Sequence, residues 1–254
     1  MPRMGRTWPV SSSQIDAPGK ILPVLFDSAS SLQVVGGTFG TNYGSTSPLS
    51  WSHTIAGNCL VVPYIAESAT NPSTALTAQV GSTNMNSLSF GQYYFLNYVG
   101  INYYVYIGML AVLNPPQGTQ TVTLSWPSGI GGFLSAGSLS YFNVASFGAV
   151  ATNLGPALAT VTVASAPRER CVNIIGGWNN TPVGYSKNKV IGPWGPNPSE
   201  RTGVIGDAAG ASSVTFSRTD SDTVTGSIAL ALSPVLPEIP MQVPVSVMTR
   251  SRLY

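Results

Sequence analysis

The chemistry that a single histidine can support is limited, and this sequence has one histidine, His53, within the segment WSHT. Hydrolysis by a Ser-His-acid triad would need His53 beside a serine and a carboxylate. Alternation along a strand would place Trp51 and His53 on the same face. No G-x-S-x-G, H-E-x-x-H, C-x-x-C or Walker A pattern occurs in the sequence. We therefore expect His53 to be a half-buried, hydrogen-bonded structural residue.

Carboxylates are scarce, although glycoside hydrolysis needs two of them at one sugar-binding cleft. Between Asp27 and Arg168 the only charged residue is Glu67. Asp220 and Asp222, in RTDSDT, have a spacing that suits two calcium ligands, but Ca²⁺ requires six or more oxygens. A solvated turn is the favoured interpretation of this pair. The sequence predicts no catalytic residue, and we expect the chain not to be an enzyme.

Metal and cofactor sites are not indicated either. Structural zinc needs four nitrogen or sulfur ligands, and one histidine with two distant cysteines does not supply them. Cys59 and Cys171 each open an apolar run, CLVVPYIA and CVNIIGG. A disulfide between them is possible, but free, buried cysteines that pack as small hydrophobic residues are favoured. No metal and no cofactor is predicted.

Exposed aromatic residues are the best candidates for ligand contact. The longest segment without periodicity spans 178–201, and loops of that length are usually functional or disordered. It contains Trp178, Tyr185 and Trp194. These rings either pack beneath their own loop or contact a partner or a glycan, because flat aromatic rings stack on sugars and anchor interfaces.

The composition points to a component of an assembly. Charged residues make up 8% of the 254 residues, against about 25% in ordinary soluble proteins. Hydroxyl and amide groups supply the polarity instead, and they can be buried between subunits when hydrogen-bonded. The alternative is a β protein that is simply rich in Ser and Thr. A net charge of +2 without a basic stripe argues against nucleic-acid binding, and no apolar stretch approaches the roughly 20 residues of a membrane-spanning helix.

Both ends of the chain are predicted to be extended arms, at 1–24 and 236–254. Closely spaced prolines exclude helices there, and the first arm lacks the apolar core of a signal peptide. We therefore expect synthesis and assembly in a cytoplasm. Docking of the arms onto neighbouring proteins is favoured over disorder. The candidate contact residues are Arg3, Arg6, Trp8, Met248, Arg250, Arg252 and Tyr254.

Between the arms, the pattern predicts one all-β domain over 25–235. Apolar residues alternate with others in TVTLSW (121–126), in SIALALS (227–233) and in YYVYIGM (103–109). Short segments of this kind, separated by Gly, Pro, Asn and Ser, indicate about ten to twelve strands. With no convincing helix, we expect a two-sheet antiparallel β-sandwich, similar to a jelly roll.

Several segments resemble the minor tail proteins of actinobacteriophages, such as mycobacteriophages. The resemblance runs over nearly the whole chain, through GRTWPV (5–10), ILPVLFDS (21–28), WSHTIAGNCLVV (51–62), LNPPQGTQTVTLSW (113–126), GSLSYFNVASFG (137–148) and GSIALALSP (226–234). Most of these are scaffold motifs, whereas the N-terminal arm with LPVLFD is the part that points to a phage. Neither the cysteine pair nor the loop at 178–201 belongs to the pattern.

The resemblance implies a structural virion protein of the tail tip. Its expected partners are other tail proteins and further copies of itself in a homo-oligomer, with assembly in the host cytoplasm. A protein at the tail tip could also contact a glycan of the host cell envelope and so contribute to host attachment. Two alternatives stay open: a carbohydrate-binding module or lectin, and a capsid decoration protein.

Overall fold

A computed structural model of the chain describes residues 21–31, 33–35, 48–71, 75–98, 101–127, 130, 132–156, 160–178, 184–194, 201–219 and 224–236. These residues form eighteen strands and no helix, and every strand pair is antiparallel. The predicted all-β antiparallel sandwich is therefore confirmed. The number of strands is larger than the ten to twelve expected.

Two central sheets face each other. The first contains seven strands: β1 (Leu25–Ala29), β2 (Gln33–Val35), β4 (Cys59–Ser68), β7 (Asn86–Tyr98), β8 (Ile101–Leu113), β10 (Gly132–Ala136) and β11 (Leu139–Phe142). The second has the order β12 (Val144–Pro156), β18 (Val224–Pro234), β14 (Arg170–Trp178), β16 (Arg201–Ala209) and β15 (Asn188–Trp194). In the first sheet, β10 and β11 pair with successive parts of β4, so they act as one interrupted strand.

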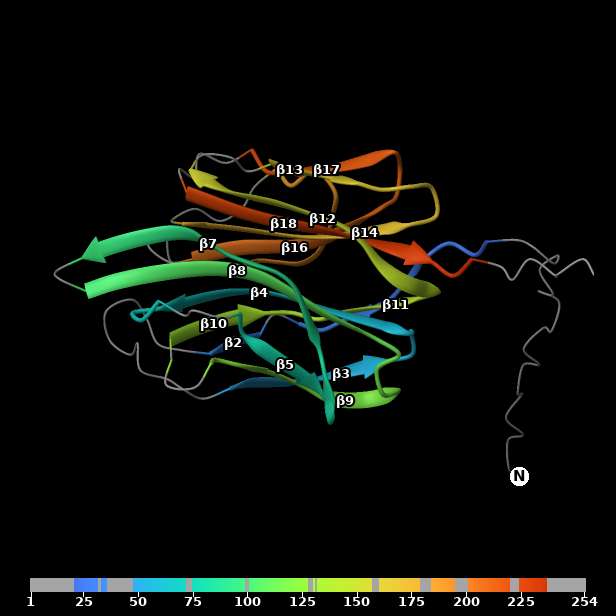
Figure 1. Cartoon of the computed structure of the whole chain (residues 1–254), viewed down its shortest axis with the longest axis horizontal. Coiled ribbons are helices and arrows are strands. Elements are labelled where there is room, and N and C mark those ends of the chain that lie inside the picture. Colours follow the sequence, from blue (N-terminus) through green and yellow to red (C-terminus); the bar gives the residue numbers. More distant parts are fainter. Residues whose placement is uncertain are drawn as a thin grey trace, which may run out of the picture.

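Two smaller sheets cover the outer faces. One consists of β3 (Leu49–Ile55), β9 (Gly118–Ser125), β5 (Thr77–Val80) and β6 (Thr83–Asn84), and the other of β13 (Thr160–Ala164) and β17 (Ser213–Ser217). Figure 1 shows the resulting stack of four layers. The strands from β1 to β11 build the two lower layers of that view, and those from β12 to β18 build the two upper ones.

Strands buried on both faces explain why there are four layers rather than the expected two. All ten residues of β4 are buried. Its Val61 and Ile65 belong to the core between the central sheets, whereas Leu60, Val62 and Tyr64 belong to the core beneath the four-stranded sheet. A continuous apolar run is typical of a strand covered on both sides, and a two-sheet sandwich would leave one of these faces in water.

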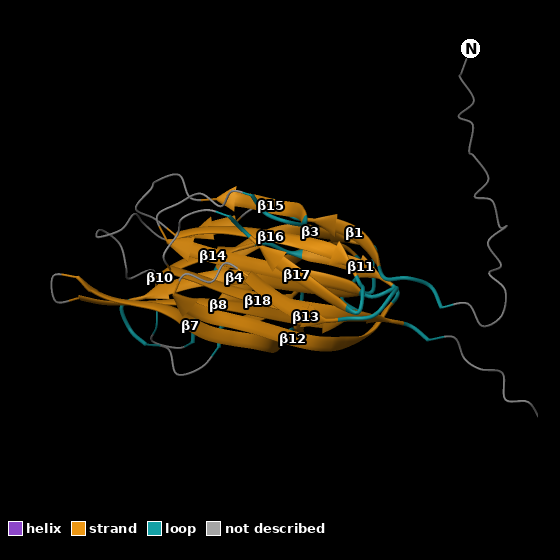
Figure 2. Ribbon diagram, turned by 90° about the horizontal axis from the view of Figure 1, so that it is seen from above, coloured by secondary structure: helices purple, strands orange, loops and turns teal. Residues whose placement is uncertain are grey.

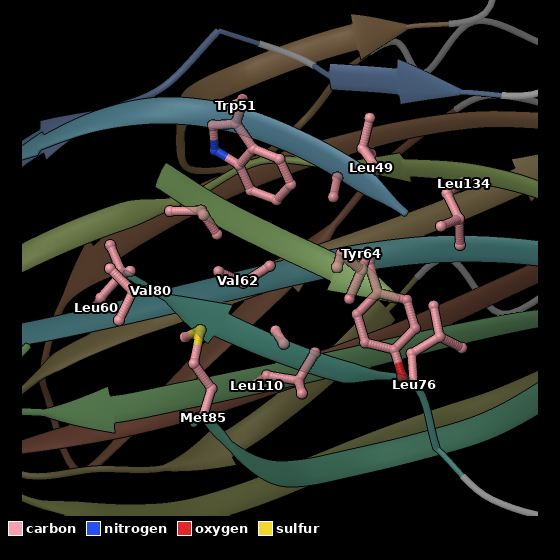
Figure 3. Close-up of a cluster of buried hydrophobic side chains, with 14 of the residues drawn as sticks. Leu49, Trp51, Leu60, Val62, Tyr64, Leu76, Val80, Met85, Leu110 and Leu134 are labelled. Atoms are coloured by element: carbon pink, nitrogen blue, oxygen red, sulfur yellow. The ribbon is translucent and has the colours of Figure 1, made fainter. Parts of the chain in front are cut away.

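The outer core beneath the four-stranded sheet holds the largest side chains. Figure 3 shows Trp51 and Leu49 on β3 packing toward Tyr64 and Val62 on β4. Burying side chains of this size stabilises a fold by roughly 1.5–3 kcal/mol each. The predicted alternation of 121–126 is confirmed here, because Val122, Leu124 and Trp126 all lie in this core.

Candidate functional site

A buried polar cluster surrounds His53 and joins β3 to β1 and β11. The His53 Nε2 atom lies 3.1 Å from the hydroxyls of both Ser28 and Ser140. Its Nδ1 atom lies 2.8 Å from the Ser138 hydroxyl, which also accepts a 2.8 Å hydrogen bond from Trp51 Nε1. The predicted hydrogen bonding of His53 is thus confirmed, whereas at 3% exposure the residue is buried and not half-buried as expected.

The acid in this cluster does not complete a triad. In a triad the carboxylate holds the histidine and the histidine activates the serine. Here Asp27 Oδ2 accepts from the Ser140 hydroxyl at 2.7 Å, and both histidine nitrogens contact serines. Burial lowers the pKa of His53, against the opposing effect of the Asp27 charge, so the ring is neutral near pH 7. This arrangement joins β1, β3 and β11 through side-chain hydrogen bonds.

Asp27 itself ties β1 to the short connection between β3 and β4. Its Oδ2 also accepts the backbone N–H groups of Ala56 at 2.9 Å and Gly57 at 2.8 Å. Burial alone would raise the pKa of Asp27, but these three hydrogen bonds and the nearby His53 hold it below its usual value. A Cβ atom at Gly57 would lie 2.2 Å from the Tyr141 carbonyl oxygen, so this close approach requires glycine.

The cysteines are separated by the fold. Cys59 lies in the core between the central sheets, and Cys171 lies in the core beneath the two-stranded sheet. Both are free and buried, as the sequence favoured. Burial raises the pKa of the Cys59 thiol to about 12, which leaves it unreactive. Within the described ranges, no group of three or more His, Cys, Asp or Glu residues is placed to hold a metal ion.

A second polar site lies on the second central sheet, at the end of the interface between the central sheets. Both Arg170 Nε and Arg170 Nη2 lie 2.8 Å from Asp207 Oδ2. The Asp207 side chain is 2% exposed and that of Arg170 is 21% exposed. Burial raises the pKa of Asp207, against the opposing effects of the Arg170 charge and of hydrogen bonds from Arg170 and Asn188.

Beside this ion pair is an open hollow of about 490 Å³, lined by Phe26, Ala29, Arg170, Asn188, Val190 and Asp207. The Phe26 ring is 38% exposed and its inner side meets Tyr141 edge-on, with ring centroids 5.8 Å apart. Sequence reasoning did not identify this site. Its residues come from β1, β14, β15 and β16, and no motif or spacing connects them.

Of the three aromatic residues predicted to contact a ligand, the structure describes the side chain of Tyr185. The hydroxyl of Tyr185 donates to Asn173 Oδ1 at 3.0 Å, and its ring stacks on Phe216, so Tyr185 packs inward. Trp178 ends β14 and pairs with Arg201, while Trp194 ends β15 and pairs with Gly203. These two backbones therefore flank β16 near the same end of the sheet. Their side chains, like Asp220 and Asp222, lie outside the described residues.

One end of the molecule carries both ends of the described chain (Figure 2). We call it the arm pole; it comprises residues 21–25, 143–146, 166–169 and 233–236. Val24 N–H donates to the Arg168 carbonyl at 2.9 Å, and Arg168 Nη1 donates to the Ile21 carbonyl at 2.8 Å. Asn143 links the other end, because its side chain donates to the Pro23 carbonyl and its own carbonyl accepts Val235 N–H.

The arm pole is strained and apolar. Asn143 and Arg168 have φ values of 62° and 77°, and such left-handed conformations cost on the order of 1–3 kcal/mol in residues other than glycine. A hollow of about 350 Å³ lies between the two chain ends. The arm pole also exposes the large apolar side chains of Leu22, Leu25, Val235 and Leu236, the last at 68%.

The predicted arm contacts cannot be placed on this surface. Residues 1–20 and 237–254 lie outside the described residues, and with them Arg3, Arg6, Trp8, Met248, Arg250, Arg252 and Tyr254. What the structure does place is the point from which each arm starts.

Comparisons of the chain with family models, with curated proteins and with solved structures found no match. In the described part of the chain, no helix is long and apolar enough to cross a membrane.

Proposed function

We propose that this protein is a non-enzymatic structural component of a bacteriophage tail tip, held in the particle through its arm pole. The observation that carries the proposal is the convergence of both chain ends on one pole rimmed with exposed apolar side chains. Soluble monomers rarely expose contiguous apolar patches of this kind unless they mark an interaction site. The choice of a tail tip among assemblies rests on the sequence resemblance.

The geometry supports attachment on one side. Chain segments that leave from the same pole reach neighbours on that side of the molecule, and an extended segment spans about 3.3 Å per residue. The ends of β14 and β15 at Trp178 and Trp194 lie away from the arm pole, because Arg170 pairs with Leu232 and Gly177 pairs with Thr225. In a docked particle, that end is left free to face the host envelope and contribute to attachment.

Immunogold labelling of intact phage particles, with antibody raised against this chain, tests the proposal. Gold at the distal tail is the expected result. Gold on the head would replace the tail assignment with capsid decoration. Absence of label from the particle, with the protein found free or on cell surfaces, would overturn the virion assignment.

A carbohydrate-binding function is the second candidate, and the hollow beside Phe26 favours it. An exposed aromatic ring next to amide and guanidinium groups suits a sugar, whose apolar face stacks on the ring while its hydroxyls form hydrogen bonds. This arrangement comes from Phe26, Asn188 and Arg170, not from the aromatic residues that the sequence indicated.

We expect Phe26→Ala to weaken binding of host-envelope glycans by about tenfold, because aromatic contacts contribute roughly 0.5–1.5 kcal/mol beyond area burial. Glycan-array binding followed by titration calorimetry measures the change. The matched control is Leu25→Ala, which removes an exposed neighbour on the same strand outside the hollow. If the unmodified protein binds no glycan, or if both variants lose binding equally, the carbohydrate site is excluded.

A further inference from the structure

Two edge strands run along the same long side of the molecule. Among the described strands, β7 pairs in a sheet only with β8, and β12 only with β18. Figure 2 shows β7 and β12 together on one side, with β15 and β1 on the opposite side. Leu154 on β12 packs over Gly91 on β7, because a Cβ atom at Gly91 would lie 2.2 Å from a Leu154 methyl carbon. The edges of both central sheets thus form one continuous surface.

This surface has only part of the usual protection of a sheet edge. Register irregularities interrupt both strands and Pro156 ends β12, but charge is absent from both. Proteins keep edge strands from pairing with other chains by placing charges, especially lysine, or prolines along them. β7 and β12 each contain thirteen residues, and neither contains an Asp, Glu, Lys or Arg. Val150 and Leu154 are 40% and 36% exposed. The opposite side, by contrast, carries Arg170, Lys187 and Asp207.

The register of β12 offers a regular stretch for pairing. Its irregularities fall between Val144 and Ser146 and between Phe147 and Val150. From Val150 to Pro156 the strand pairs with β18 without a shift, so its outer backbone groups can continue the regular alternation of narrow and wide hydrogen-bonded pairs of an antiparallel ladder.

The size of this surface suits a stable interface. Thirteen residues at about 3.3 Å each span about 43 Å. Two stacked sheets, with an intersheet distance of about 10 Å, present a side about 20 Å wide. The product, roughly 860 Å², is close to the 800 Å² or so that each partner contributes to a standard interface.

We propose that a second copy of this chain docks on the β7/β12 edge, with β12 pairing antiparallel to β12 of the other copy. A strand paired antiparallel with itself generates a two-fold axis, so the contact closes and each copy uses the same surface. The second central sheet then continues across the interface. The inference rests on the proposed function, which expects a homo-oligomer, and it names the surface through which the copies would associate. It can be tested on the purified protein without the particle.

Thr152→Lys tests the contact, because it places a charge in the middle of the regular stretch. Thr152 is exposed, so the substitution leaves the core unchanged. The matched control is Thr162→Lys, the same substitution at an exposed position of β13 in the outer two-stranded sheet. The full chain and both variants are compared by native mass spectrometry and by light scattering across a range of concentrations.

We expect a dimer for the unmodified protein and for Thr162→Lys, and at least a tenfold higher dissociation constant for Thr152→Lys. Amide hydrogen exchange at 144–156 should slow as the dimer forms. The proposal is overturned if the unmodified protein is a monomer at all concentrations. It is also overturned if Thr152→Lys dimerises as tightly as Thr162→Lys, or if the dimer does not slow amide exchange at 144–156. Either failure leaves the virion labelling result unaffected, so the two proposals fail separately.

Discussion

Replacing Arg170 with methionine is expected to lower the free energy of unfolding by about 3–5 kcal/mol at pH 7, the cost of breaking a buried ion pair from one side. The substitution keeps most of the aliphatic side chain but removes both nitrogens that contact Asp207 Oδ2. The Asp207 carboxylate is then left buried without its cation. Urea denaturation followed by fluorescence measures the change.

The pH dependence identifies the cause. Burial already raises the pKa of Asp207 in the native protein, and loss of Arg170 raises it further. A carboxyl group with a raised pKa in the folded state destabilises the fold when it is ionised. This destabilisation is complete at pH values above the folded-state pKa. It disappears as the pH falls toward the unfolded-state pKa of 3.8, because the group is then protonated in both states. The difference between Arg170→Met and the unmodified protein should therefore shrink as the pH falls toward about 4.

Two control variants separate charge from packing. Lys187→Met removes an exposed cation from the same side of the sheet as Asp207 and should change the free energy of unfolding by less than about 1 kcal/mol. The double variant Arg170→Met/Asp207→Leu should recover most of the stability, because replacing both partners by apolar residues leaves no buried charge. A double variant as unstable as Arg170→Met would show that packing, and not the uncompensated carboxylate, causes the loss.

Replacing Asp27 with alanine is expected to cost about 3 kcal/mol and to release β1 from the rest of the first central sheet. Three hydrogen bonds to one carboxylate oxygen are lost, and hydrogen bonds to charged groups contribute roughly 1.5–3 kcal/mol each without adding fully. Faster amide exchange in 25–29 than in β4 would locate the change. Because β1 follows the N-terminal arm, the same variant should weaken incorporation into particles.

Asp27→Asn serves as the control, since the amide keeps one acceptor oxygen without the charge. About half of the loss should remain. The pKa of Asp27 lies below its usual value, so its contribution is present above the unfolded value of 3.8 and is lost as the pH falls through the folded-state pKa. The stability difference between the unmodified protein and Asp27→Asn should therefore vanish in acid. A difference that is constant with pH would contradict a role for the charge.

The faces of several strands were readable from the sequence. In β18, alternation placed Ile228, Leu230 and Leu232 on one face and the alanines on the other, and the structure buries the first set between the central sheets. In β8, the odd positions Val105, Ile107 and Met109 enter the same core, while Tyr106 faces the outer sheet. A two-residue side-chain period makes such assignments local, because each side chain's face follows from its neighbours along the strand.

What covers each face could not be read in the same way. Ala229 and Ala231 lie in the core beneath β13 and β17, where small side chains let the outer sheet approach closely. The alternating pattern looks the same whether the second face meets water or another sheet. For this reason the sequence predicted two sheets, whereas the structure has four.

Residue types and short-range patterns were enough to predict an all-β chain with little charge, free buried cysteines and a hydrogen-bonded His53. These properties depend on residue type and on the nearest neighbours along the chain. Which polar groups meet became visible only in the folded chain. Asp27 reaches Ala56 and Ser140, Arg170 reaches Asp207, and Phe26 lies beside Asn188. Such contacts join strands that are far apart in sequence, and they depend on sheet order and register, which no local pattern encodes.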